Sequence, residues 1–410
     1  MESFKKWLKQ EVVLVIAVLL AVISSFFVKP DRNYIGYIDW ETLALLFSLM
    51  VVMGGFKSLG VFTKLGHELL KRVKTDRQVE CIFILACFFT SMFITNDVAL
   101  ITFVPFTIEV LKMAKMREKT AMTVILETIA ANLGSMATPI GNPQNIYLYI
   151  QSGYTLSDFF RIIGPFTVLS FILLLIAIFS KKANPLELSR RALRRNLLAS
   201  GRVKRVRNRA LFRRPDVRAD QDRLMGGEVS LGDVMQSNST ALFDFYVVLF
   251  VICLLGITRT LSIMIIGFTV LLFVIVIDKN ALKRVDYSLI LTFVGFFIFV
   301  GNMQRIPAFS NAIESMLQGN ELLTTIGISQ IISNVPATLL LTGFTKNWEM
   351  LLIGSNLGGL GTLIASMASL ISFKFMAKEY PDEKGKYLLR FTVWNVVFLA
   401  INLAFYYIMN

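Results

Sequence analysis

The strongest constraint on this chain is a series of apolar runs that are long enough to cross a lipid bilayer. They cover residues 11–28, 159–180, 241–257, 260–278, 286–303 and 388–408. A helix needs about 20 apolar residues to span the hydrocarbon core, and these runs approach or reach that length. The strands of a membrane β-barrel would instead alternate apolar and polar residues. We therefore expect an all-α polytopic membrane protein.

Composition agrees with this fold class. Hydrophobic residues make up 55% of the 410 residues and charged residues only 17%, whereas soluble proteins carry about 25% charge. Residues 1–28 could also be a cleaved signal peptide, but their apolar run is long for one. We therefore expect a retained first helix.

Motifs for catalysis or ATP-driven transport are missing from the sequence. The three cysteines lie inside apolar runs without metal-binding spacing. No phosphate-binding loop of the GxxxxGK[ST] type is present, and the single histidine, His67, excludes a paired-histidine zinc motif. We expect neither an enzyme nor a pump, and no cofactor beyond a coupling ion.

Basic charge is concentrated in residues 181–240, which contain the run RRALRRNLLASGRVKRVRNRALFRR. A nucleic-acid surface is one interpretation. Apolar spans flank the segment on both sides, which favours a cytoplasmic loop under the positive-inside rule. We therefore expect no nucleic-acid partner. Lys5, Lys6 and Lys9 place the N-terminus in the cytoplasm by the same rule, and we expect a multi-pass protein of the plasma membrane, in bacteria the inner membrane.

Three sequence landmarks recur in the same order in both halves of the chain. LFSLMVVMGGFKSLGVF (46–62) matches FVGFFIFVGNMQRIPAF (293–309), ITND (94–97) matches ISNV (332–335), and ANLGSMAT (131–138) matches SNLGGLGT (355–362). The flanking charges give the corresponding segments opposite directions across the membrane. Such an inverted repeat is typical of secondary transporters, whose binding site lies at the repeat interface.

The repeat divides the chain into scaffold and transport parts. We expect scaffold segments at 1–78 (helices 11–28 and 39–56, interfacial helix 57–74) and 241–320, transport segments at 79–180 (hairpin 79–114, broken helix 119–150, helix 159–180) and 321–410 (hairpin 322–346, broken helix 347–375, helix 388–408), and the basic loop between them. The hairpins are expected to be re-entrant. Pro139 and Pro143 predict the first break, because each removes a helical hydrogen bond. Broken backbone at membrane depth needs protein or a wet cavity beside it, so we expect each break to meet a hairpin tip.

Asp97 is the most unusual side chain at these tips. A carboxylate near the bilayer midplane costs about 2.5–3.5 kcal/mol, so Asp97 is either protonated or paired with a cation. Its alternative role is to cap the helix that begins at Val98. Glu127 is a second candidate acid, with a polar neighbour in the bundle as its alternative partner. Asn96, Asn132, Asn334 and Asn356 form a symmetric set for ion or substrate coordination, with packing between helices as the alternative.

At these residues the chain resembles the ion transporter superfamily. The nearest branches are the divalent-anion:sodium symporters and the citrate-transporter-like permeases, and the arsenite and sodium/proton antiporter permeases are cousins. The resemblance implies a homodimer that works by an elevator motion of the transport part. It also implies tips that bind substrate carboxylates and, with the facing breaks, two sodium ions. Carried over to this chain, the substrate-binding positions are Thr95, Asn96, Ser333, Asn334, Thr138 and Thr362, and the ion-binding positions, with Glu127 added, are Asp97, Asn132, Gly134, Asn356 and Gly358. Na⁺ is expected at Asn96, Asp97 and Asn132.

Two residues depart from the Ser-Asn-Thr tips of the symporters. Asp97 replaces a hydroxyl with a charge that would repel an anion unless it is neutralised, and Val335 removes a hydroxyl. We expect a secondary active transporter that moves a small anion, a carboxylate or an inorganic oxyanion, coupled to Na⁺ or H⁺. The alternative is a Na⁺/H⁺ antiporter or an arsenite-type efflux permease, in which Asp97 exchanges ions.

Overall fold

The computed structural model describes residues 11–61, 73, 75–180, 183–184 and 231–409, and within these ranges it contains helices and no strand. The helices are α2 (Val12–Phe27), α3 (Asn33–Tyr37), α4 (Trp40–Ser58), α6 (Asp76–Ser91), α7 (Asn96–Met113), α8 (Arg117–Ser135), α9 (Pro143–Ser152), α10 (Leu156–Phe179), α12 (Leu231–Ile257), α13 (Ile263–Ile277), α14 (Tyr287–Gln304), α15 (Pro307–Leu317), α16 (Glu321–Ile332), α17 (Asn334–Leu341), α18 (Trp348–Leu357), α19 (Met367–Glu379) and α20 (Lys384–Met409), with 3-10 turns η1 (Lys279–Arg284), η2 (Leu363–Ala365) and η3 (Pro381–Glu383).

The membrane character predicted from the sequence is confirmed. Five helical stretches in the described part are long and apolar enough to cross a membrane: α4, α10, Thr240–Ile257 of α12, α14 and Pro381–Met409. Large apolar side chains point outward from several of them and from α13, where Val276 is 72% exposed. Such a surface is stable against hydrocarbon and costly against water.

Each half of the chain contains a helical hairpin followed by a broken helix. In the first half, α6 and α7 form the hairpin, and a helix that begins at Arg117 is interrupted between Ser135 and Pro143. In the second half, α16 and α17 form the hairpin, and α18 and α19 flank the interruption. These bounds lie within a few residues of the predicted ones. The re-entry of the hairpins into the membrane stays a prediction.

Helices of one half pack directly against helices of the other half. α2 contacts α14 and α13 contacts α4, so each contact joins one helix from each half. Small residues permit both approaches: a Cβ at Gly295 would lie 3.0 Å from Ala17, and one at Gly267 would lie 2.9 Å from Ala44. The second part of each broken helix also packs against the other half: α19 contacts α7 and α8, and α9 contacts α17 and α18.

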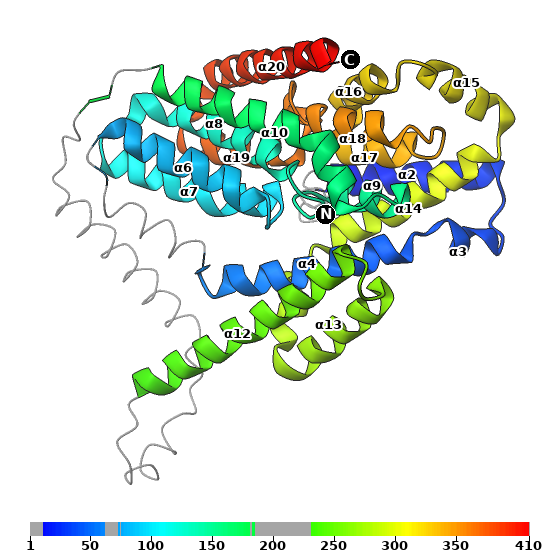
Figure 1. Cartoon of the computed structure of the whole chain (residues 1–410), viewed down its shortest axis with the longest axis horizontal. Coiled ribbons are helices and arrows are strands. Elements are labelled where there is room, and N and C mark those ends of the chain that lie inside the picture. Colours follow the sequence, from blue (N-terminus) through cyan, green and yellow to red (C-terminus); the bar gives the residue numbers. More distant parts are fainter. Residues whose placement is uncertain (1–10, 62–72, 74, 181–182, 185–230, 410) are drawn as a thin grey trace, which may run out of the picture.

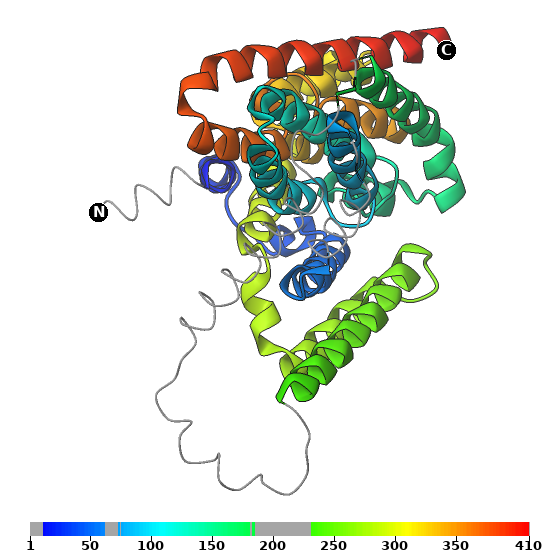
Figure 2. The same ribbon diagram turned by 90° about the vertical axis from the view of Figure 1, so that its left-hand side faces the viewer.

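Figure 1 shows how these groups are arranged in space. Helices α6, α7 and α8 lie side by side on the left, α16, α17 and α18 lie on the right, and α20 crosses the top. In the view of Figure 2, α12 and α13 form a helical pair below the other described helices. The hairpins and broken helices therefore form one interlocked group, and α2, α4, α13 and α14 form a second group beside it.

Two expected segments differ from the structure. Helix α12 begins at Leu231, inside the segment 181–240 that we expected to be a loop. The sequence did not predict this start, because residues 231–240 are too polar to belong to an apolar run. Helix α4 continues through Ser58, so it includes the first residues of the expected interfacial helix 57–74, and residues 62–72 of that helix lie outside the described residues. Most of the basic loop, residues 185–230, also lies outside them.

Candidate functional site

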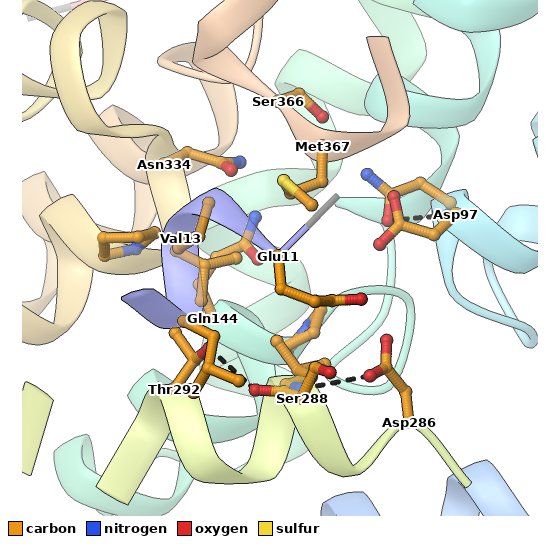
Figure 3. Close-up of a pocket in the computed structure, with 16 residues that line it drawn as sticks. Glu11, Val13, Asp97, Gln144, Asp286, Ser288, Thr292, Asn334, Ser366 and Met367 are labelled. Atoms are coloured by element: carbon orange, nitrogen blue, oxygen red, sulfur yellow. Dashed lines mark hydrogen bonds between the residues drawn. The ribbon is translucent and has the colours of Figure 1, made fainter. Parts of the chain in front are cut away.

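Both hairpin tips and both helix breaks meet at one small cavity of about 80 Å³. A cavity of this size can hold an ion with a few water molecules. Figure 3 shows Asp97 on one side of this cavity and Asn334 across from it, with Asp286 of the scaffold below Asp97. The lining residues are Glu11, Val13, Leu14, Asn96, Asp97, Pro143, Gln144, Asp286, Ser288, Leu289, Thr292, Asn334, Val335, Pro336, Ser366 and Met367.

The first tip leaves a carboxylate oxygen without a partner. Helix α7 begins at Asn96, whose Oδ1 accepts a hydrogen bond from the backbone N–H of Asp97 (3.0 Å), and whose Nδ2 donates to Asn132 Oδ1 (3.0 Å). The N-cap residue of α7 is Thr95, whose side chain makes no capping hydrogen bond, and Asp97 lies within the first turn, so Asp97 does not cap a helix at Val98. Asp97 Oδ1 is buried and has no hydrogen-bond partner among the described residues. A bare buried carboxylate oxygen needs a proton or a cation.

The second tip has an asparagine at the corresponding position, Asn334, and no acid. Asn334 Nδ2 donates to the backbone carbonyl of Ser355 (3.2 Å), and Ser333 Oγ donates to the carbonyl of Ala365 (3.4 Å). Ser333 has φ +76° and ψ 153°, a conformation that costs a non-glycine residue about 1–3 kcal/mol. Val335 stands where Asp97 stands in the first tip and gives the cavity an apolar wall.

Each broken helix is held by the asparagine of the other half. Asn132 Oδ1 accepts from Ser366 Oγ (3.1 Å), across the repeat. Asn356 Oδ1 accepts from Asn142 Nδ2 (3.0 Å), and Asn356 Nδ2 donates to Asn145 Oδ1 (2.8 Å). Asn142 follows Asn132 by ten residues, as Ser366 follows Asn356. The two contacts therefore connect corresponding positions, and they fix the breaks against one another.

The remaining sequence-predicted positions in the breaks contact their own hairpins rather than the cavity. The Thr138 hydroxyl donates to the carbonyl of Met92, and the Thr362 hydroxyl donates to the carbonyl of Gln330 (3.3 Å). Both carbonyls lie four residues before the tip asparagine. These threonines hold each break to its hairpin, and their hydroxyl protons are not directed at the cavity.

Gly134 and Gly358 make the close approach between break and hairpin possible. A Cβ at Gly134 would lie 2.2 Å from the Phe88 carbonyl oxygen and 2.6 Å from Ser91 Oγ. A Cβ at Gly358 would lie 2.6 Å from Ser329 Oγ. Because any side chain would collide there, both positions require glycine. Neither residue lines the cavity.

Thr95 and Glu127 lie apart from the tip cavity. Thr95 lines a larger neighbouring cavity that also includes Asp97. Glu127 is fully buried inside the bundle, where Thr107 donates a hydrogen bond to its Oε1, and its Oε2 has no partner among the described residues. The polar neighbour anticipated as the alternative for Glu127 is therefore present, and the structure does not bring Glu127 to Asp97.

Sequence reasoning missed several residues of the cavity. Gln144 is 1% exposed, and its Oε1 has no hydrogen-bond partner among the described residues. Asp286 caps α14 by accepting from the backbone N–H of Leu289 (3.1 Å). Its signal was the pair Asp286–Tyr287, which repeats Asp39–Trp40 at the start of α4.

The donor atoms that line the cavity are oxygens, which suit hard cations. No group of three or more His, Cys, Asp or Glu side chains that could hold a metal ion occurs in the described part of the chain. The cavity instead offers carboxylate, amide and hydroxyl oxygens. Helices α7 and α17 also begin at it, and their N-termini favour anions. Donors for a cation and an electropositive helix end for an anion are thus present together.

Comparison with known proteins gives a family match over most of the chain. Residues 4–347 match the citrate transporter family CitMHS. This range includes both hairpins and the first break, and it ends just before α18.

Individual relatives match over similar lengths. The inner membrane protein YbiR of Escherichia coli K12 is 30% identical over 364 residues, which cover 87% of this chain and 86% of YbiR. An uncharacterized transporter of Methanocaldococcus jannaschii is 29% identical over 372 residues, 90% of this chain and 89% of that protein. The silicon efflux transporter LSI3 of rice is 36% identical over 152 residues, 36% of this chain and 30% of LSI3.

Proposed function

The chain belongs to the citrate transporter family, and from this premise we propose that it moves a small anion across the membrane with Na⁺ or H⁺ as the coupling ion. Its family and relatives support a secondary transporter of an anion or another ion. The coupling ion, the residues that bind it and the motion are our proposals.

The observation that carries the proposal is the pair of unpartnered oxygens in the tip cavity. Asp97 Oδ1 and Gln144 Oε1 are both buried, both line the cavity, and neither has a hydrogen-bond partner among the described residues. A buried oxygen without a partner costs about 1–3 kcal/mol, and more when it is charged. A bound Na⁺, or a proton on Asp97, would remove this cost. We assign the coupling ion to this side of the cavity.

The substrate anion would bind beside that ion. The Asn96 and Asn334 side-chain amides line the cavity and each has a second N–H to offer to the anion, whereas the Ser366 hydroxyl proton is already donated to Asn132. The cation on Asp97 would neutralise the charge that otherwise repels an anion, since like charges at close range in low dielectric are strongly unfavourable. Asn132 acts as a positioning residue, because it holds Asn96 through its side-chain oxygen.

We further propose that the interlocked hairpins and broken helices move as one body against α2, α4, α13 and α14. The packing supports this division, because the broken helices of the two halves are hydrogen-bonded to one another. We propose that the protein is a homodimer in a bacterial inner membrane with a cytoplasmic N-terminus. The name of the relative YbiR, an inner membrane protein, supports the proposed location in the inner membrane.

A second candidate function is the efflux of a metalloid acid. The similarity to a silicon efflux transporter over 152 residues favours it. In that case Asp97 would exchange protons or Na⁺ against an uncharged acid instead of accompanying an anion.

Reconstitution into proteoliposomes tests the two candidates together. We expect an inward Na⁺ or H⁺ gradient to drive accumulation of labelled citrate, succinate or sulfate by the wild type above its outside concentration. If none of these anions is accumulated while arsenite or silicic acid flux responds to a gradient, the anion proposal is wrong and the efflux candidate replaces it. Empty liposomes provide the background.

A further inference from the structure

Two large cavities occupy corresponding positions in the two copies of the repeat. The first has a volume of about 500 Å³ and is lined by Gly54 and Lys57 near the end of α4. The second has a volume of about 820 Å³ and is lined by Gly301 and Gln304 near the end of α14. Gly301 corresponds to Gly54, and Gln304 follows it by three residues as Lys57 follows Gly54. The two cavities are therefore equivalent by sequence.

The tip cavity is joined to the first of these cavities and separated from the second. It shares Asp97, Pro143, Asp286 and Leu289 with the 500 Å³ cavity. None of the described residues that line the 820 Å³ cavity also lines the tip cavity. The structure is therefore open between the tips and the end of α4, and closed between the tips and the end of α14.

A thin aromatic layer lies at the closed side. On α9, Gln144 lines the tip cavity and Tyr147 lines the 820 Å³ cavity, so about 4.5 Å of helix separates them. The Tyr147 ring packs against Phe297 of α14 with 5.5 Å between the ring centroids, and both side chains are buried. The Tyr147 hydroxyl also forms a hydrogen bond with Thr342 Oγ1 (3.1 Å). This ring pair stands at the boundary between the two cavities.

Tyr149 holds the same helix to the turn between α12 and α13. Its ring is buried, and its hydroxyl donates to the carbonyl of Ile257 (2.8 Å). Its own carbonyl accepts from Arg259 Nη2 (3.1 Å), and the guanidinium carbon lies 5.4 Å from the centre of the Tyr149 ring. That carbonyl is in the last turn of α9, where carbonyls lack a partner within the helix and a cation is favourable.

Two further hydrogen bonds join the same surfaces. Gln151 Nε2 donates to Asp39 Oδ2 at the start of α4 (2.8 Å), and Gln304 Nε2 donates to the carbonyl of Gly343, which follows α17. Asp286, the counterpart of Asp39 in the repeat, instead lines both the tip cavity and the 500 Å³ cavity. Equivalent acids therefore serve a closing contact on one side and an open cavity on the other.

We propose that α9 is the gate between the tip cavity and the 820 Å³ cavity. Tyr147 closes it against Phe297, and Tyr149 and Gln151 latch it to the turn after α12 and to the start of α4. The latch must break before the tips can open toward the end of α14. This inference rests on the proposed function, because a gate is needed only if the hairpins and breaks move against the scaffold.

The test measures how fast a membrane-impermeant thiol reagent labels Val335→Cys from each side of the membrane, with Cys81, Cys87 and Cys253 replaced by alanine. Val335 lines the tip cavity. We expect slow labelling from the side of the 820 Å³ cavity while the latch is intact. Tyr149→Phe should raise this rate roughly fivefold and lower the rate from the other side, because it removes one hydrogen bond that favours the closed gate.

Arg259→Asn provides a second latch variant. Arg259 has φ +58°, a left-handed conformation that asparagine tolerates, so the turn should still form while the shorter side chain no longer reaches Tyr149. We expect a rise of similar size. Arg259→Lys keeps a cationic donor and should return the rate most of the way to that of the unaltered latch.

The matched control is Tyr407→Phe, which removes a hydroxyl from a ring 59% exposed on α20 and should leave both labelling rates unchanged. Unchanged labelling in both latch variants, or an equal rise in Tyr407→Phe, would overturn the gate. The labelling needs no substrate, so it decides the gate by itself. A wild type that transports none of the tested anions would overturn the proposed function instead, and the transport assay alone reveals that outcome.

Discussion

The two hairpin halves share a framework and differ in several of the residues that line the cavity. In both, a threonine hydroxyl of the break bonds to a hairpin carbonyl, a glycine packs on a hairpin serine, and an asparagine reaches the break of the other half. Asn96 and Asn334 line the cavity at corresponding positions, but Asp97 and Gln144 of the first half correspond to the apolar Val335 and Ala368 of the second.

This difference separates architecture from chemistry. The contacts that recur in both halves bring the tips and breaks together. Both halves need them in order to fold. Residues that occur in one half only are free to serve one ion or one substrate group. The first half therefore carries the proposed coupling ion, and the second half contributes mainly to the substrate.

The largest effect on stability is expected where the glycines contact the hairpins. Gly134→Ala should lower the free energy of unfolding by about 3 kcal/mol, because its Cβ would meet a backbone carbonyl at 2.2 Å. Gly358→Ala should cost about 1–2 kcal/mol, since the nearest atom is the Ser329 side-chain oxygen at 2.6 Å. Unfolding by SDS in mixed micelles measures both. Equal costs would mean that the two breaks are held in the same way.

The contacts across the repeat should come next. Asn142→Ala removes a donor to Asn356 and also the cap of α9, where Asn142 Oδ1 accepts from the backbone N–H of Asn145 (2.9 Å). We expect a loss of about 2–3 kcal/mol. Ser366→Ala removes one bond to Asn132 and should cost about 1 kcal/mol. A larger cost for Ser366→Ala than for Asn142→Ala would contradict this order, which rests on the additional cap contact of Asn142.

Gln330 holds the second break by hydrogen bonds that the first hairpin lacks, and Gln330→Met would give the second hairpin the residue that the first has at this position. Its amide donates to the carbonyls of Gly358 (3.0 Å) and Leu360 (2.9 Å), and its Oε1 accepts from the backbone N–H of Thr362 (2.9 Å). The corresponding residue of the first half is Met92. Gln330→Met should cost about 1–2 kcal/mol, whereas the control Ile331→Ala, at a side chain 73% exposed, should change stability by less than about 0.5 kcal/mol. Equal values would show that Gln330 does not hold the break.

The smallest change in stability is expected at Asp97, and it has the opposite sign. In buffer without Na⁺ at neutral pH, Asp97→Asn should stabilise the protein by about 1 kcal/mol, because it removes a buried charge that lacks a partner. Added Na⁺, or acidification if the ion is H⁺, should stabilise the wild type and not the variant. Thermal unfolding across a Na⁺ and pH series measures this. Stabilisation of both proteins by the same ion would place the ion elsewhere.

Much of the fold was predictable, because apolar runs, prolines and a repeated asparagine are local signals. The hairpins, the breaks and the convergence of Asn96, Asp97 and Asn334 followed from them. The contacts of Asn132 with Ser366 and of Asn356 with Asn142 were not predicted, since each joins residues more than 200 positions apart. Extending the repeat beyond the three landmarks would have aligned them.

The roles of single hydroxyl groups were harder to predict. Thr138 and Thr362 were expected to bind substrate, and in the structure both hydroxyls donate to hairpin carbonyls. A threonine in a broken helix can serve either a ligand or the backbone, and the choice depends on which acceptor lies within reach. Three-dimensional geometry decides this, and the sequence pattern is the same for both outcomes.

The most direct test of the account compares two kinds of flux in Asp97→Asn proteoliposomes, using the best transported of citrate, succinate and sulfate. One measurement is gradient-driven accumulation, and the other is exchange of labelled for unlabelled anion at equal concentrations on both sides. We predict that the variant still exchanges the anion but no longer accumulates it above the outside concentration under any Na⁺ or H⁺ gradient. Accumulation equal to that of the wild type would contradict the assignment of the coupling ion to Asp97.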